Sequence, residues 1–84
     1  DLTIYLDPNS CHRGYGKTLM KEMIDIARKS GYKNIVSLVT AGNIASEKLH
    51  ERFGFVKKAT FEEIGYKHNQ WLAVSYYYLQ LENQ

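Results

Sequence analysis

The stretch CHRGYGKT, residues 11–18, lies between a segment typical of a strand and a segment typical of a helix. Before it, Leu2–Leu6 reads LTIYL and is rich in strand-forming residues, and Asp7–Ser10 then reads as a loop. After it, apolar residues recur at three- and four-residue spacing, which indicates one buried face of a helix. These residues are Leu19, Met20, Met23, Ile24 and Ala27. The stretch is therefore predicted to be the turn that begins the first helix.

A second strand and a second helix are expected further along the chain. Gly31 is a natural end for the first helix, because glycine adopts the left-handed conformation there without strain. The segment Asn34–Thr40, NIVSLVT, is apolar enough for a central strand. A break follows, and a short helix is expected over Ala45–Phe53, closed by Gly54.

The last part of the chain is predicted to form two strands, Phe55–Phe61 and Trp71–Leu81, joined by a loop that contains Gly65 and Asn69. The fold class is therefore α/β with a mixed sheet, in the order β-α-β-α-β-β. The first strand, helix and second strand make a βαβ unit, so the first two strands should be parallel. The last two strands should pair antiparallel. Four strands and two helices leave one sheet face and one edge poorly covered.

Length and composition set the limits on function. The chain has 84 residues, 44% hydrophobic and 24% charged, which fits one small globular domain with a marginal core. The net charge of +2 neither demands nucleic acid nor excludes a phosphorylated ligand. The single Cys11 cannot form an internal disulfide, which favours the cytoplasm. We expect no membrane span, because no apolar run approaches the roughly 20 residues that cross a bilayer, and no signal peptide is visible.

The turn before the first helix predicts a site for a phosphate or pyrophosphate. The first N–H groups of a helix lack internal partners and carry the positive end of its dipole. Gly14 and Gly16 allow close approach of the backbone to a ligand, and Arg13 and Lys17 add cationic donors. The alternative is a helix start that needs its glycines only for a tight turn.

Three phosphate-binding motifs compete for this turn. The dinucleotide fingerprint fails, because its third small residue would fall on Leu19. Gly16, Lys17 and Thr18 match the end of a P-loop, but Cys11 stands where the first glycine belongs. The third motif is the acetyl-CoA pyrophosphate turn of the GNAT superfamily, in which a Gln or Arg precedes two spaced small residues.

The chain resembles the GNAT superfamily in three segments. Gly14 and Gly16 fill the two small positions of the pyrophosphate turn, while Cys11 occupies the Gln or Arg position and removes one side-chain contribution. Residues Asn43–Phe55, NIASEKLHERFGF, are similar to a second family segment. Residues Gly65–Leu72, GYKHNQWL, resemble the phosphinothricin N-acetyltransferase-like subgroup. The resemblance extends from Thr3 to about Leu81, and residues 1–84 are identified as a single partial GNAT domain.

This resemblance implies a binding mode for acetyl-CoA as the cosubstrate. The two parallel strands would splay apart, and the pantetheine arm would lie in the gap between them. Strand backbone would contact the pantetheine and thioester, the turn would hold the pyrophosphate, and the start of the second helix would contact the arm. The implied residues are Ile4, Tyr5, Leu6, Cys11, His12, Arg13, Gly14, Tyr15, Gly16, Asn43 and Ser46. His50 occupies the position of the residue that protonates the departing thiolate.

Each of these residues also has a purely structural interpretation. Asn43 could cap the second helix, a role that can coexist with ligand binding. His50 could be a solvated histidine on a short helix. Trp71 and Tyr76–Tyr78 could line a substrate or dimer surface, although aromatic strands are more often core. His12 and His68 lack metal-ligand company, so no metal site is expected.

The resemblance also contains departures. Ala73 stands where the subgroup has Asp, and Asn69 replaces a glycine. The family's domain is about twice as long, and the N-terminal half that supplies much of its acceptor site has no counterpart here. Four glutamates are compared with the family's general base, and none of them matches its position; they are Glu47, Glu51, Glu62 and Glu63.

Two functions are therefore expected to compete. The first is an acetyl-CoA-dependent N-acetyltransferase, in which a primary amine of a small molecule attacks the thioester directly. It would be completed by the missing N-terminal half or by a partner chain. The second is a non-catalytic half-domain that binds CoA or another phosphate ligand and homodimerises.

Overall fold

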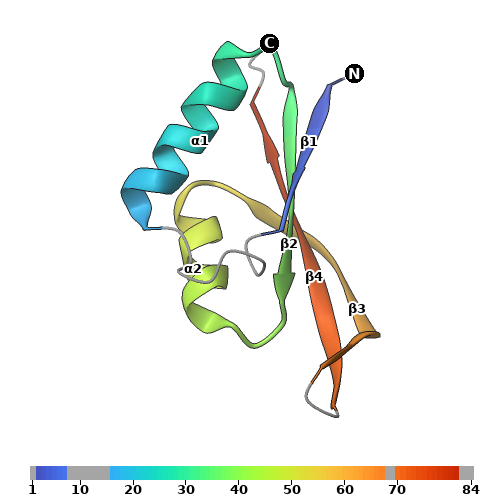
Figure 1. Ribbon diagram of the computed structural model, residues 1–84. Coiled ribbons are helices and arrows are strands. Elements are labelled where there is room, and N and C mark those ends of the chain that lie inside the picture. Colours follow the sequence, from blue (N-terminus) through green and yellow to red (C-terminus); the bar gives the residue numbers. More distant parts are fainter. Residues whose placement is uncertain (1, 8–15, 68–69, 82–84) are drawn as a thin grey trace.

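The computed structural model describes residues 2–7, 16–67 and 70–81, which form four strands and two helices in the predicted order (Figure 1). Both helices lie on the same side of the sheet (Figure 1). The elements are β1 (Thr3–Leu6), α1 (Lys17–Lys29), β2 (Asn34–Thr40), α2 (Ile44–Arg52), β3 (Val56–Lys67) and β4 (Gln70–Gln80).

The sheet is mixed, with the strand order β1-β2-β4-β3. β1 and β2 are parallel, as the βαβ unit predicts, whereas β4 pairs antiparallel with both β2 and β3. The parallel ladder begins with Thr3 opposite Asn34 and ends with Leu6 opposite Ser37. β1 is paired with β2 along its whole length, and β2 continues beyond this ladder to Thr40.

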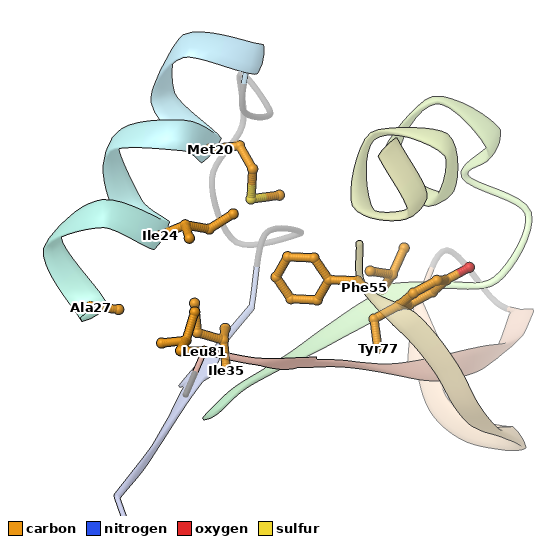
Figure 2. Packing of buried hydrophobic residues seen from close by; sticks show 8 residues of the cluster. Met20, Ile24, Ala27, Ile35, Phe55, Tyr77 and Leu81 are labelled. Atoms are coloured by element: carbon orange, nitrogen blue, oxygen red, sulfur yellow. The ribbon is translucent and has the colours of Figure 1, made fainter. Parts of the chain in front are cut away.

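The hydrophobic core lies between the two helices and one face of the sheet (Figure 2). Alternation along β2 places Ile35, Ser37 and Val39 on this buried face, while the residues between them are less buried. The buried hydrophobic residues of the core are Met20, Ile24, Ala27, Ile35, Val39, Phe55, Tyr77 and Leu81.

The first helix follows the predicted pattern. Met20, Ile24 and Ala27 are buried at helical spacing, whereas Leu19 stays 44% exposed. The helix ends before Gly31, whose φ of 90° is the left-handed conformation that glycine adopts most readily. One periodic apolar stripe and one glycine therefore fix the length and orientation of α1.

The predicted loop between the last two strands is wrong in its extent. β3 continues through Gly65 to Lys67, and Gly65 pairs with Leu72 of β4 instead of lying in a loop. The ladder absorbs two register shifts, one between Lys57 and Ala59 and one between Phe61 and Gly65. Such irregularities break the alternation on which a strand prediction depends, so the second half of β3 reads as polar loop. His68 and Asn69 lie outside the described residues.

The face of the sheet opposite the helices carries exposed apolar residues, as expected for a sheet with helices on one side only. Tyr5 on β1 is 67% exposed and Val56 on β3 is 54% exposed. The pairings of β1 with β2, of β2 with β4 and of β4 with β3 place both side chains on this face. Tyr76 packs edge-on against Phe61 on the same face, with ring centroids 5.3 Å apart. Neither described helix is long and apolar enough to cross a membrane.

Candidate functional site

The start of α1 has the features expected of an anion site. Gly16 is the N-cap residue, and the first backbone hydrogen bond of the helix runs from the Met20 N–H to the Gly16 carbonyl at 3.0 Å. The first turn holds no acidic residue, and no side chain caps it. The N–H groups of the first turn therefore precede the intrahelical ladder, at the positive end of the dipole.

Gly16 leaves open space in front of this helix start. A Cβ atom at Gly16 would meet no heavy atom within 4 Å, although its φ of −73° and ψ of 171° would suit any residue. Glycine is therefore needed at this position neither for backbone conformation nor for packing against the described residues. The predicted ligand residues Cys11, His12, Arg13, Gly14 and Tyr15 lie outside the described residues.

The predicted strand residues of the site lie on β1. Ile4 and Leu6 are partly buried against the core and line a cavity of about 160 Å³ between β1 and α1, whereas the Tyr5 side chain is exposed. All three are paired with β2 in the parallel ladder. A ligand between the strands would therefore have to bind beyond Leu6, beside the part of β2 that has no partner on β1.

The start of α2 confirms that Asn43 is a helix cap. Its Oδ1 accepts a hydrogen bond from the Ser46 N–H at 3.2 Å, and Glu47 Oε2 accepts one from the Gly42 N–H at 3.1 Å. These two bonds satisfy donors at a helix end. Asn43 is exposed, and its amide nitrogen takes no part in the capping bond. Capping therefore leaves this residue able to contact a ligand.

The interpretation of His50 as a solvated histidine is wrong. The side chain is only 1% exposed, and its Nδ1 lies 2.7 Å from the Ser46 carbonyl oxygen. A carbonyl can only accept, so Nδ1 carries the proton that forms this bond. In the neutral ring, Nε2 then has a lone pair and accepts from the Ser37 hydroxyl at 2.7 Å.

The surroundings of His50 are mostly apolar. Its ring packs edge-on against Phe55 at 4.9 Å between centroids and lies 5.4 Å from the Tyr77 ring. Burial lowers the pKa of His50 from its ordinary value of 6.5, and the bond to the Ser46 carbonyl opposes this only in part. The imidazole is therefore neutral at pH 7, and in that state its Nε2 accepts a proton instead of donating one.

Two residues of this cluster were not singled out as site residues by their sequence pattern. Ser37 is one hydroxyl-bearing residue within an apolar strand. Only its position among the alternate residues of β2 that face the core distinguishes it. Tyr77 was predicted to be either core or a binding surface, and it is core, with no exposed area. Its hydroxyl is buried and has no hydrogen-bond partner among the described residues, and burial, together with Glu47 and Glu51, raises its pKa.

The structure brings the predicted residues of α2 to the end of the parallel ladder. Ser37 is paired in register with Leu6, and Ser37 also holds His50, whose other nitrogen bonds to Ser46. Leu6, Ser46 and His50 are thus linked through one residue of β2. The described residues contain no group of three His, Cys, Asp or Glu side chains that could hold a metal ion.

Comparison with known proteins identifies this arrangement. A family model described as the acetyltransferase (GNAT) family matches residues 2–55, which include β1, α1, β2 and α2. The chain belongs to the GNAT acetyltransferase family. Its partial GNAT fold has the β-α-β-α-β-β order and the parallel strand pair that the resemblance predicted.

Curated relatives place this GNAT chain near the phosphinothricin acetyltransferases. It is 33% identical over 82 residues to an L-amino acid N-acyltransferase of Escherichia coli K12, covering 98% of this chain and 48% of the relative. It is 29% identical over 80 residues to a phosphinothricin N-acetyltransferase of Streptomyces viridochromogenes, covering 95% of this chain and 44% of the relative. The chain thus spans about half the length of the curated relatives it matches.

A solved structure supports the same placement. An acetyltransferase from Salmonella typhimurium, described with acetyl-CoA as its cofactor, has a TM-score of 0.80 and 33% sequence identity to this GNAT chain. The match covers 87% of this chain and 42% of that protein. The likeness in fold therefore extends over more of the chain than the family match, which ends at residue 55.

Proposed function

We propose that this GNAT chain is the acetyl-CoA-binding half of an N-acetyltransferase that acetylates a primary amine of a small molecule. The observation that carries the proposal is the parallel β1–β2 pair joined by α1, with an open glycine at the start of the helix. The named relatives support the acceptor class, because they are N-acyltransferases of L-amino acids and of phosphinothricin.

The described residues suit the parts of acetyl-CoA. The first turn of α1 supplies N–H donors and the basic Lys17 for a pyrophosphate, and Gly16 lets it approach. The pantetheine would pass the end of β1 and the start of α2, where Asn43 and Ser46 lie. The full set of proposed ligand residues is Ile4, Tyr5, Leu6, Cys11, His12, Arg13, Gly14, Tyr15, Gly16, Asn43 and Ser46.

The chemistry proposed is direct attack of the amine on the thioester carbonyl. The new C–N bond forms as the C–S bond breaks, the amine loses a proton, and the thiolate gains one. We assign to His50 the step that gives the thiolate its proton. Because the resting ring is neutral, it must first accept a proton at Nε2, and the amine releases one in the same reaction. The requirement that His50 change its charge is thus part of the proposal.

Calorimetric titration of the chain with acetyl-CoA, alongside its oligomeric mass, tests the cosubstrate. Asp and Asn are both good N-cap residues, so Gly16→Asp and Gly16→Asn should leave α1 folded. We expect saturable binding by the unaltered chain, and an affinity at least about tenfold weaker for Gly16→Asp than for Gly16→Asn, because the carboxylate repels the pyrophosphate. Equal affinities would place the ligand elsewhere.

The second candidate function is a homodimeric half-domain that binds CoA without turnover. The observation that favours it is the exposed apolar face of the sheet. Release of free thiol from acetyl-CoA in the presence of L-amino acids separates the two. Binding without thiol release supports this second function, and a folded chain that binds no acetyl-CoA contradicts both.

A further inference from the structure

Both partners of the Ser37–His50 hydrogen bond are buried. Ser37 has no exposed area and His50 has 1%. The Ser46 carbonyl occupies the other ring nitrogen. The Ser37 hydroxyl is therefore the only hydrogen-bond partner of Nε2 that the described residues provide.

A hydroxyl is suited to a ring that changes its charge. It carries one proton and two lone pairs, so it can donate to the lone pair of a neutral imidazole or accept from the N–H of an imidazolium. A buried N–H without an acceptor is costly, and the cost is larger when the group is charged. The bond to an imidazolium is also the stronger of the two, because its donor is charged.

We propose that Ser37 is a positioning residue for His50, whose hydroxyl keeps Nε2 hydrogen-bonded in both charge states and so allows the buried ring to take up and release a proton. The inference rests on the proposed function for its purpose, since the assigned step requires His50 to accept a proton and then return it. Ser37 itself does not exchange a proton with the acetyl group or the thiolate.

The other groups around His50 do not supply this property. Tyr77 from β4 is a titratable side chain that packs against the ring, and its hydroxyl makes no hydrogen bond to any described residue. Glu47 and Glu51 on α2 act on Tyr77 electrostatically. The residues that α1 and the start of β3 add to this core, such as Met20 and Phe55, are not titratable.

A purely structural role for the bond makes a different prediction. If Ser37 only tethers β2 to α2, its removal weakens the fold without changing the proton affinity of His50. Ser75 provides a matched control, because it is a buried serine on the neighbouring strand whose hydroxyl bonds to Thr60 Oγ1 at 2.9 Å. Its loss also removes a buried hydroxyl, but one without contact to the ring.

The test is an NMR titration of the His50 ring in the 84-residue chain without acetyl-CoA. We expect Ser37→Ala to lower the measured pKa of His50 by about one pH unit, because the imidazolium loses its acceptor, and Ser75→Ala to leave it unchanged. Ser37→Cys replaces the hydroxyl by a somewhat larger thiol that accepts hydrogen bonds only weakly, so it should lower the pKa of His50 as well, and it replaces the alanine variant if that one does not fold. Where a chain unfolds before the ring titrates, the pH dependence of its unfolding free energy gives the same pKa.

An unchanged or raised pKa of His50 in a folded Ser37 variant would overturn the proposal. An equal fall in Ser75→Ala would also overturn it, since the effect would then follow from any loss of a buried hydroxyl. Because no acetyl-CoA is present, this result is independent of the calorimetric test of the proposed function.

Discussion

Leu6 and Ser37 face each other at the last position of the parallel ladder between β1 and β2. The ladder stops there, and the Ser37 hydroxyl on β2 binds His50 from α2. The point where the two strands cease to be paired is therefore also the point where the second helix is attached to the sheet. Five predictions test the interactions around this point and the supports of the fold.

The buried His50 makes the stability of the chain depend on pH. Its pKa is lowered in the folded state, so the unfolded chain binds the proton more tightly. The stability that the neutral ring contributes to the fold is fully present above the unfolded pKa of about 6.5. It is lost as the pH falls toward the folded pKa, by about 1.4 kcal/mol for each pH unit between the two values. Urea unfolding from pH 7.5 downward should show this loss. The loss should be smaller in His50→Gln, and an identical pH dependence of both chains would contradict the burial of a neutral ring.

Met20 and Leu19 are neighbours on α1 with opposite surroundings. Met20 is fully buried and Leu19 is 44% exposed. Met20→Ala should lower the free energy of unfolding by about 2–4 kcal/mol, because it leaves a cavity in the core. Leu19→Ala, the matched control, should lower it by less than about 1 kcal/mol. Chemical denaturation of both variants measures this, and equal effects would mean that the helix is rotated from the described face.

Gly54 and Gly16 differ in what an added methyl group would do. Gly54 has a φ of 92° and a Cβ there would contact Leu79 Cδ1 at 3.6 Å, whereas Gly16 has φ −73° and no neighbour within 4 Å. Gly54→Ala should destabilise the fold by about 1–2 kcal/mol through backbone strain. Gly16→Ala should lower stability by less than this, because the backbone angles at Gly16 suit alanine and only the weak N-cap preference of alanine opposes the change. A thermal midpoint that falls no further in Gly54→Ala than in Gly16→Ala would contradict the left-handed turn at Gly54.

The two proposed roles of Asn43, capping of α2 and contact with acetyl-CoA, can be tested separately. Asn43→Ala removes the cap and should cost about 1 kcal/mol of stability. Asn43→Asp keeps the oxygen that accepts from the Ser46 N–H, so its stability should stay near that of the unaltered chain. If the amide nitrogen also contacts the pantetheine, Asn43→Asp should still bind acetyl-CoA more weakly. Calorimetry and denaturation on the same samples test this, and full affinity in a stable Asn43→Asp chain would leave only the capping role.

The unpaired hydroxyl of Tyr77 is the subject of the fifth prediction. It is buried and no residue in the described part of the chain hydrogen-bonds to it, so its desolvation is not compensated. Tyr77→Phe should therefore be as stable as the unaltered chain, or more stable by up to about 1 kcal/mol. A clear loss of stability in urea unfolding would show that the hydroxyl is bonded in solution.

Much of the fold could be predicted from local patterns, because its signals are local. The stripe of apolar residues on α1, the glycines at positions 31 and 54 and the Asn43 cap all act within a few residues of themselves. The extent of β3 could not be predicted in this way. Its two register shifts are set by pairing with β4, and they leave no regular alternation in the sequence.

The candidate site divides in the same way. The glycine at the start of α1 was visible in the sequence because a helix start has its own signature. The partnership of Ser37 and His50 was not visible, since 13 residues separate them and their contact depends on how α2 packs on β2. The burial of His50 was missed for the same reason, because its neighbours on α2 are mostly polar.

The position of β4 has a consequence for how the chain is made. β4 is the last of the described strands to be synthesised, yet it lies between β2 and β3 and pairs with both. During translation, β2 and β3 leave the ribosome with no strand to join them, and the sheet can close only after residue 80 has emerged. A chain interrupted within β4 would lose the centre of its sheet, so folding should be a late, all-or-none event in the life of the nascent chain.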